Sequence, residues 1–393
     1  MTQLAQLSFD DLVDLGSAKK RRDDLVVFLG RSRGRLIDNV KYLYLQALSK
    51  DYGFKPLFFT HHKDEYAMLW ERGLPVITLD ADGIEQLTTA GALVFDDQFI
   101  HEMEAFALGF TAKRIQLWHG IPLKKIGFPE IESAVNMTEE KVLSLSMGYA
   151  NYDLVASTSP WVTKELFSRV FKSGGFVDYG YPRNDVLLRA PGRHDLLNVD
   201  TSCYAALKQH RKKGGKVVIY MPTFRDNGMD FLDAAGNFVL NPAMLAAFAE
   251  KHNTLFLLKL HPYVNDSRLS ALPGVVRYPS QLDIYPLLPL ADALVTDYSS
   301  VYFDFLLLDK PILYFAYDLE RYISQDRELF FPFEDMTTGP GMATQEELLQ
   351  HLQAALAGED SHGMERAALR DKLFAHRDAD AADRLCRHIK EIL

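Results

Sequence analysis

"ADALVTDYSSVYFDFLLLDKPILYF", residues 291–315, decides how the chain is expected to fold. An apolar strand at 293–296 runs into a polar turn, an apolar helix follows at 300–308, and a second apolar strand begins at Pro311. Two buried strands joined by a helix are typical of a parallel α/β sheet, in which ligands bind at the carboxyl ends of the strands. The turn from Asp297 to Ser300 is therefore placed either to cap the helix alone or to hold a ligand such as a phosphate.

The same alternation of strand and helix extends over the whole chain in two series. The predicted strands are 25–29, 56–59, 75–79, 92–95, 114–118, 154–156 and 176–179, then 216–220, 254–260, 275–278, 293–296 and 311–315. The predicted helices include 38–49, 141–149, 160–169, 242–251, 282–288 and 300–308. Between the series, 191–202 and 211–215 are rich in Pro, Gly and charge, which is typical of a linker. We predict two open, parallel α/β sheets facing across a cleft, in domains 1–190 and 191–393, the second with a helical tail.

Composition narrows the functional classes. The 393 residues are 48% hydrophobic and 24% charged, as in a globular protein, and the net charge of -10 argues against nucleic acid as a partner. The two cysteines, Cys203 and Cys386, have no metal-ligand spacing and fit a reducing compartment. The N-terminal segment places acids before cations, the reverse of a secretory signal, and no apolar run is long enough to span a bilayer. We therefore expect a cytoplasmic protein or one peripheral to a membrane.

"LWHGIPLKKIG", residues 117–127, is the first candidate for catalysis. His119 follows a predicted strand, and an imidazole is suited to general-base chemistry near neutral pH. Gly120 would let another group approach closely, and Lys124 adds a cation nearby. The alternative is a histidine that only hydrogen-bonds a turn. Farther upstream, Asp96 and Asp97 in "FDDQF" are predicted to end a strand at the cleft without forming a metal site.

Three further strand ends carry polar groups in the second half of the chain. "VVIYMPTFRDNG", residues 217–228, offers Thr223 and Arg225, and a guanidinium can bind a phosphate with two N–H groups. "LFLLKLHP", residues 255–262, delivers Lys259 and His261 to one face of its strand. In the opening stretch, Ser299 or Ser300 is expected to cap the helix, whose free N–H groups favour an anion. Each has a structural alternative: an Arg–Asp pair in a turn, or a cap without a ligand.

These motifs together resemble those of the CDP-glycerol glycerophosphotransferases, the family of teichoic acid primases and polymerases with relatives in capsule synthesis. The resemblance spans roughly residues 24–345 and rests on segments in the family's order. They are "LWHGIPLKKIG", "YGYPRND" (179–185), "VIYMPTFRD", "LKLHP", "ADALVTDYSSVYFDFLLLDKPILYFAYDLERY" (291–322) and "RELFFPFEDMTTGPG" (327–341). Ile121 and Phe224 depart from the residues common in the family, which bears on substrate fit.

The resemblance implies a GT-B-like pair of Rossmann-type domains, with the acceptor on the first and a CDP-linked donor on the second. It implies transfer of a polyol phosphate, most simply glycerol phosphate, to a hydroxyl with release of CMP, and no metal or other cofactor. The catalytic residues would be His119 and His261. Donor and phosphate binding would involve Thr223, Arg225, Asp297, Ser299 and Ser300. Acceptor binding would involve Gly120, Lys124, Arg31, Asp38 and Asn39, although the loop at 30–35 also reads as a flexible basic loop.

Several readings of the function stay open. A member of the family could use CDP-ribitol or another CDP-polyol as its donor. The sequence does not distinguish synthesis of teichoic acid from synthesis of a capsule polymer. A nucleotide-sugar glycosyltransferase on the same architecture would release UDP or GDP, and a non-catalytic polymer-binding protein would turn over no donor. Acceptors in the family are usually lipid-linked or polymeric, and the basic run 19–22 suggests contact with an anionic membrane.

Overall fold

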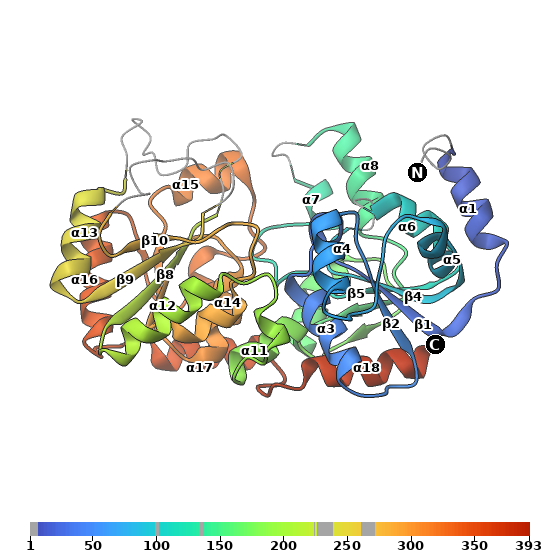
Figure 1. The fold of residues 1–393 in the computed structure, drawn as a ribbon. Helices are drawn as coiled ribbons and strands as arrows, with labels where there is room; N and C mark the ends of the chain where they lie inside the picture. Colours follow the sequence, from blue (N-terminus) through green and yellow to red (C-terminus); the bar gives the residue numbers. More distant parts are fainter. Residues whose placement is uncertain (1–6, 99–101, 134–136, 224, 226–238, 261–271) are drawn as a thin grey trace.

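Two parallel sheets form separate lobes (Figure 1). The computed structural model describes all residues except 1–6, 99–101, 134–136, 224, 226–238 and 261–271. The 7-stranded sheet of the first domain has the order β3-β2-β1-β4-β5-β6-β7. Its strands are β1 (Arg22–Leu29), β2 (Lys55–Phe59), β3 (Val76–Ile77), β4 (Ala90–Phe95), β5 (Lys113–Gln116), β6 (Leu154–Ala156) and β7 (Phe176–Val177). All their pairings among the described residues are parallel, which agrees with their nearly continuous apolar sequences.

The second domain repeats this arrangement in a 6-stranded sheet with the order β10-β9-β8-β11-β12-β13. Its strands are β8 (Lys216–Met221), β9 (Thr254–Leu258), β10 (Val275–Arg277), β11 (Ala293–Thr296), β12 (Ile312–Phe315) and β13 (Gly341–Met342). The predicted GT-B-like pair of Rossmann-type domains is confirmed. Each predicted strand is present to within a few residues at its ends, and β13 is the one described strand that the sequence analysis missed.

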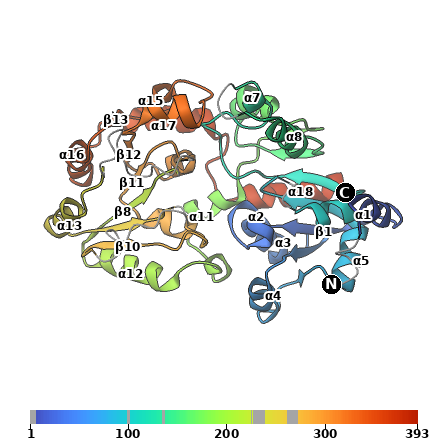
Figure 2. The same ribbon diagram turned by 90° about the horizontal axis from the view of Figure 1, so that it is seen from above.

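The helices cover both faces of the sheets (Figures 1 and 2). In the first domain they are α1 (Phe9–Ser17), α2 (Arg31–Gly34), α3 (Asp38–Ser49), α4 (Lys63–Trp70), α5 (Ala81–Thr89), α6 (Met103–Leu108), α7 (Phe128–Ile131), α8 (Glu139–Gly148), α9 (Pro160–Val162), α10 (Ser168–Val170) and α11 (Asp185–Leu188). Farther along the chain they are α12 (Thr201–Lys212), α13 (Pro242–Lys251), α14 (Val301–Phe305), α15 (Leu319–Arg321), α16 (Gln345–Leu356), α17 (Gly363–Leu373) and α18 (Ala381–Ile392). A regular helix, α12, lies between the two segments read as linker and overlaps the ends of both, with Asp200 as its N-cap.

The last helix corrects the predicted position of the tail. We expected the tail to belong to the second domain, but α18 packs against α3 of the first (Figures 1 and 2). Its apolar face, Ala382, Leu385, Cys386 and Ile389, is buried in the core of the first domain. Asp185 fixes the start of α18 by accepting hydrogen bonds from the backbone N–H groups of the first two helical residues, at 3.0 Å each. An amphipathic helix is stable wherever its apolar stripe is covered, and sequence periodicity does not say by which sheet.

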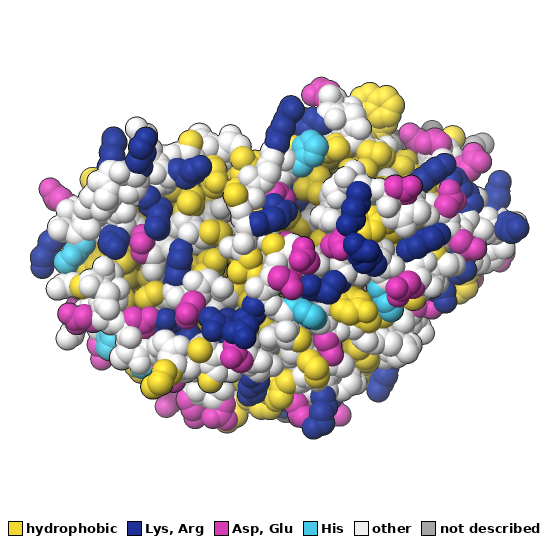
Figure 3. Space-filling model, turned by 90° about the horizontal axis from the view of Figure 1, so that it is seen from below, with side chains coloured by type: hydrophobic (Ala, Val, Ile, Leu, Met, Phe, Trp, Pro, Cys, Tyr) yellow, Lys and Arg dark blue, Asp and Glu magenta, His cyan; other side chains and the backbone are white. Residues whose placement is uncertain are grey.

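The two lobes pack against each other through apolar side chains. Helix α11 contacts the 3₁₀ helix η7 (Tyr285–Leu290) of the second domain, where Val186, Leu187 and Leu287 are buried in one continuous core cluster. On the face seen in Figure 3, basic and acidic side chains intermingle. Over the described part of the chain, no helix is both long enough and apolar enough to cross a membrane.

Candidate active site

A cavity of about 840 Å³ opens between the two domains at the carboxyl ends of the strands. The first domain contributes the predicted residues Arg31, His119, Gly120 and Lys124 to its lining, and the second contributes Thr223, Ser299 and Ser300. A volume of this size is within the usual range for small-molecule sites. The structure thus brings together motifs that lie up to about 270 residues apart in the sequence.

His119 is held as a neutral base with a fixed tautomer. Its Nδ1 lies 2.8 Å from the backbone carbonyl oxygen of Asp96. A carbonyl oxygen can only accept, so Nδ1 carries the proton and Nε2 keeps a free lone pair. Burial, and next the charge of Arg31, lower the pKa of His119 to about 4. At neutral pH the imidazole is therefore neutral and able to accept a proton through Nε2.

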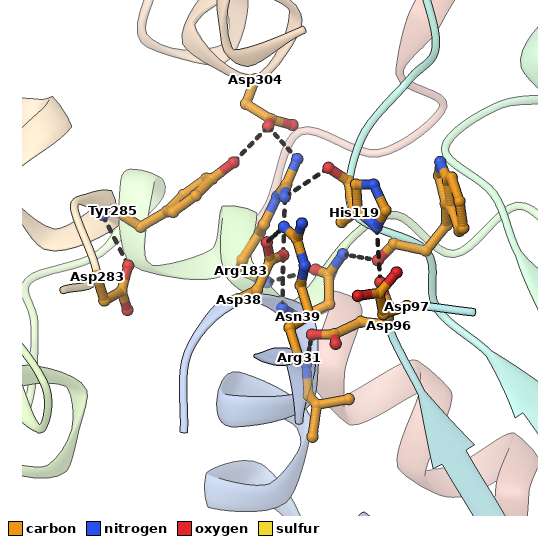
Figure 4. Close-up of polar contacts among 12 residues, drawn as sticks. Arg31, Asp38, Asn39, Asp96, Asp97, His119, Arg183, Asp283, Tyr285 and Asp304 are labelled. Atoms are coloured by element: carbon orange, nitrogen blue, oxygen red, sulfur yellow. Dashed lines mark hydrogen bonds and ion pairs between the residues drawn. The ribbon is translucent and has the colours of Figure 1, made fainter. Parts of the chain in front are cut away.

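The backbone on both sides of this imidazole is also fixed. Trp118 has a φ of +56°, a strained value for a non-glycine residue. Its N–H donates to Gln116 Oε1 at 2.7 Å, and its carbonyl accepts from Asn39 Nδ2 at 2.8 Å. The carbonyl of His119 itself accepts from Arg183 Nη1 at 2.9 Å (Figure 4). These bonds hold the turn that presents the base.

Asp38 and Asn39, predicted to bind the acceptor, lie behind the base. Asp38 is buried, and its carboxylate accepts from Arg31 Nη1 at 3.0 Å and from Arg183 Nη1 at 2.7 Å. Burial opposes its ionisation, but Arg183 and Arg31 outweigh burial and lower the pKa of Asp38 to about 2. The side-chain amide of Asn39 donates to the carbonyl of Trp118 and accepts from the backbone N–H of Arg183. Direct contact of either residue with an acceptor stays a prediction.

Ser300 does not cap its helix, contrary to our expectation. It stands at the N-cap of α14 but has helical backbone angles, φ −61° and ψ −7°, and its side chain makes no capping hydrogen bond. Its hydroxyl points instead toward Gly120, where an added Cβ would lie 3.0 Å from Ser300 Oγ. Gly120 has a φ of +140°, so both its conformation and this close approach require glycine. The two motifs meet directly across the cleft.

Asp297 and Arg225 are engaged by protein groups beneath the second wall of the cavity. Asp297 accepts from the backbone N–H of Thr223 at 2.8 Å and from Arg225 Nη1 at 2.8 Å. Arg225 is fully buried, and its Nε and Nη2 donate to Asp318 at 2.9 Å each. The guanidinium carbon lies 5.0 Å from the ring centroid of Tyr298. This cluster shapes the loop that presents Thr223, whose hydroxyl is buried without a hydrogen-bond partner.

A strip of backbone pairing joins the domains on the Lys124 side of the cavity. Lys124 and Leu329 form an antiparallel bridge, flanked by hydrogen bonds from the N–H of Lys125 to Glu328 at 2.8 Å and from the N–H of Phe330 to Leu123 at 3.0 Å. The sequence analysis quoted both segments as motifs but did not predict that they pair. No pattern within either segment names its partner, because the partners lie about 200 residues apart.

The remaining predicted groups lie in or around this site. His261 lies outside the described residues. Lys259, from the same motif, donates to the backbone carbonyls of Ser280 and Leu282 at 2.8 and 2.7 Å and so holds the loop before η7. Asp96 is buried, with its pKa raised by burial, and Asp97 lines the cavity. Among the residues that the structure describes, no group of three or more His, Cys, Asp or Glu side chains could hold a metal ion.

Arg183 is the functional candidate that sequence reasoning missed, although its motif "YGYPRND" was quoted. The signal was Asp304, an acid within the apolar helical run "VYFDFLLL". A buried carboxylate needs a cationic or hydrogen-bonding partner, and Arg183 Nη2 provides it at 2.6 Å.

Comparison with known proteins gives one consistent family. The model of CDP-Glycerol:Poly(glycerophosphate) glycerophosphotransferase matches residues 13–391. The teichoic acid ribitol-phosphate polymerase TarL of Staphylococcus aureus is 26% identical over 94% of this chain, which spans 63% of TarL. A teichoic acid glycerol-phosphate transferase of the same species is 30% identical over 70% of each chain.

The solved structures agree on the fold. A structure of the wall teichoic acid polymerase TagF soaked with CDPG superposes with a TM-score of 0.74 and 20% identity, over 100% of this chain and 95% of that one. A UDP-GlcNAc 2-epimerase from Neisseria meningitidis, bound to UDP-GlcNAc, has a TM-score of 0.53 and 10% identity over 93% of this chain and 99% of that chain. Since the family model covers nearly the whole sequence, this chain belongs to the CDP-glycerol:poly(glycerophosphate) glycerophosphotransferase family.

Proposed function

We propose that this protein transfers a polyol-phosphate unit, most simply glycerol phosphate, from a CDP-linked donor to a hydroxyl of an acceptor and releases CMP. One observation carries the proposal: His119, a neutral imidazole with a lone pair on Nε2, lines the same cavity as the hydroxyl-bearing residues Thr223, Ser299 and Ser300. A base opposite a group of hydroxyl donors is what phosphoryl transfer to an alcohol requires.

The reaction consists of one displacement at phosphorus. The acceptor oxygen forms a bond to the phosphorus that carries the polyol, and its proton passes to Nε2 of His119. The bond from this phosphorus to the bridging oxygen breaks, and the electron pair leaves on CMP. Hydroxyl and backbone N–H groups near Ser299, Ser300 and Thr223 stabilise the charge that develops on the phosphate oxygens. His261 is retained as a second catalytic candidate on the donor side.

The donor is assigned to the second domain and the acceptor to the first. Arg31 and Lys124, on the first-domain side of the cavity, supply cations suited to an anionic acceptor. Asp38 and Asn39, which lie behind His119, support the wall from the first domain. Asp297 and Arg225 support the wall from the second domain.

The relatives differ in the polyol for which they are named. Relatives named for glycerol phosphate and others named for ribitol phosphate are both similar to this chain, and TarL matches over 94% of it. CDP-ribitol is therefore the second donor to test, for a product in teichoic acid or capsule synthesis.

The acceptor is proposed to be lipid-linked or polymeric, used by a cytoplasmic protein at the inner face of the membrane. The basic run Lys19 to Arg22 leads into β1, which begins at Arg22, and supplies cations for an anionic surface. Sedimentation with anionic vesicles would support this location, and recovery in the soluble fraction alone, with no vesicle binding, would refute it.

The function is tested by nucleotide release. Purified protein is incubated with CDP-glycerol, CDP-ribitol, UDP-sugars or GDP-sugars, each with a glycerol-phosphate primer, and the nucleotide products are separated. The proposal predicts CMP from a CDP-polyol, dependent on the primer and lost in His119→Ala. Release of UDP or GDP would identify a glycosyltransferase instead. No turnover of any donor, with polymer binding unchanged in His119→Ala, would identify a non-catalytic binding protein.

A further inference from the structure

We propose that Arg183 is a positioning residue that makes the alignment of His119 depend on the closed arrangement of the two domains. This inference rests on the proposed function, in which His119 is the base. Arg183 comes from the 3₁₀ turn that precedes α11, and its side chain is only 3% exposed. Figure 4 shows its guanidinium between His119 and Asp38 on one side and Asp304 on the other.

On the side of the base, Arg183 holds the turn that presents the imidazole. Its Nη1 donates to the carbonyl of His119 at 2.9 Å and to Asp38 Oδ1 at 2.7 Å. Its own backbone N–H donates to Asn39 Oδ1 at 3.1 Å, and Asn39 in turn binds the carbonyl of Trp118. The turn contains a positive φ at Trp118, and such a conformation persists only where surrounding contacts enforce it.

On the side of the second domain, Arg183 contacts α14, the helix that follows Ser299 and Ser300. Its Nη2 donates to Asp304 Oδ2 at 2.6 Å, and the same oxygen accepts from the hydroxyl of Tyr285 at 2.7 Å. Asp304 is fully buried in α14, four residues after Ser300. An added Cβ on Gly120 would lie 3.1 Å from Arg183 Nη2 and 3.0 Å from Ser300 Oγ, so all three groups meet at one point.

These contacts couple two events. Separating the domains would break the ion pair between the buried side chains of Asp304 and Arg183, which is costly. Arg183 would then keep only the bonds of Nη1 to Asp38 and to the carbonyl of His119, and Nη2 would lose the contact that holds the other end of the guanidinium. The base is therefore aligned only when α14, with Ser299 and Ser300 before it, is packed against Arg183. Such a link between domain closure and the assembly of a catalytic site is known from other enzymes.

The planar fork of arginine is needed for this task. One nitrogen serves the base turn while the other serves Asp304, and the ammonium of lysine is a single point that cannot span both. The chain offers a matched control in Lys41, whose side chain is 0% exposed. Lys41 Nζ pairs across the domains with Asp283 Oδ2 at 2.7 Å and donates to the carbonyls of Asp195 and Leu197, which lie away from the turn that presents His119.

The test compares turnover with donor binding in Arg183→Gln, Arg183→Lys and Lys41→Gln. We expect kcat to fall about a hundredfold in Arg183→Gln, because a displacement of about 1 Å at a reacting group has this effect, while the Kd for CDP-glycerol stays within about threefold. Arg183→Lys should recover little of the loss, and Lys41→Gln should lower stability more than kcat. A folded Arg183→Gln with unchanged kcat, or an equal loss of kcat in Lys41→Gln, would overturn the proposal. If Arg183→Gln does not fold, Asp304→Asn, which removes the charge across the domain boundary, is held to the same expectation.

A second readout does not need activity. The imidazole nitrogens of His119 are followed by NMR in labelled protein, with the assignment taken from His119→Gln. Arg183→Gln should shift these signals and broaden them through exchange between orientations, whereas Lys41→Gln should leave them in place. Unchanged signals in Arg183→Gln would overturn the positioning role even if the wild-type protein released no CMP. A wild-type protein without CMP release, but with shifted signals in Arg183→Gln, would refute the proposed function alone.

Discussion

The two walls of the cavity differ in where their ionisable side chains lie. The base wall, residues 116–120 with Asn39 and Arg183 behind them, presents a titratable imidazole and holds it through bonds to backbone carbonyls. The hydroxyl wall, residues 222–223 and 297–300, presents neutral hydroxyls and is held from beneath by Arg225 between two carboxylates. The comparison suggests a division of labour, in which changes to the base wall affect the rate and changes to the hydroxyl wall affect donor binding and stability.

The largest effect is expected at the base wall. His119→Ala should lower kcat by about 10²–10⁴-fold, the usual contribution of a general base, with little change in the Kd for the donor. CMP release at saturating donor measures kcat, and calorimetry measures the Kd for the donor. His388→Ala, on α18 and paired with Glu391, is the control and should behave as wild type. Equal losses in binding and rate would erase the distinction between the walls.

At the hydroxyl wall, Arg225→Ala should act first on stability. It leaves the buried carboxylate of Asp297 without its cation and leaves Asp318 with Arg321 alone, and breaking a buried pair in this way typically costs about 3–5 kcal/mol in the free energy of unfolding. Urea denaturation measures this loss. Arg21→Ala, which breaks an exposed pair with Asp23, should change stability by less than about 1 kcal/mol. A similar small change in Arg225→Ala would mean that the cluster does not support the wall.

Gly120→Ala tests the point where the walls meet. The added Cβ would press on Ser300 Oγ at 3.0 Å in a backbone conformation that disfavours it. With strain of about 1–3 kcal/mol, we expect turnover to fall about tenfold or more. Gly73 also has a positive φ, +68°, but nothing lies within 4 Å of its Cβ position. Gly73→Ala should therefore lower stability and spare turnover, and equal turnover in both variants would contradict the close contact.

The smallest effect is a shift in pH dependence. Arg31 is one cause of the lowered pKa of His119, so Arg31→Gln should move that pKa upward, toward the ordinary value of 6.5. The acid limb of kcat/KM against pH would then lie at higher pH than in the wild type, because the base is protonated earlier as pH falls. A shift to lower pH, or none, would show that Arg31 does not act on the imidazole.

The sequence predicted most of the fold because its strands are short, apolar and separated by turn residues. The strands at 154–156 and 293–296 and the helices at 38–49 and 242–251 were placed with the observed bounds. Periodicity could not reveal what lies opposite each element. Helix α18 was assigned to the wrong domain for this reason, and the two-residue strand β13 is too short for any period to appear.

The candidate site was predicted as a set of strand ends, and the structure brings His119, Gly120, Thr223, Ser299 and Ser300 together around one cavity. Which charges face the cavity was harder to predict. The resemblance implies that Asp297 and Arg225 bind the donor, and the structure shows that their side chains bind each other. The sequence shows that a charge exists, but only the tertiary structure shows which partner it has.

The most direct test of this account is the protonation state of His119 in the wild-type protein. Titration of its imidazole nitrogens by NMR should find the proton on Nδ1 throughout the neutral range, with half-protonation at a pKa of about 4. That result would establish a neutral base with a free lone pair on Nε2. A pKa at the ordinary value of 6.5, or a proton on Nε2, would contradict the central claim that the fold prepares His119 to accept the acceptor's proton.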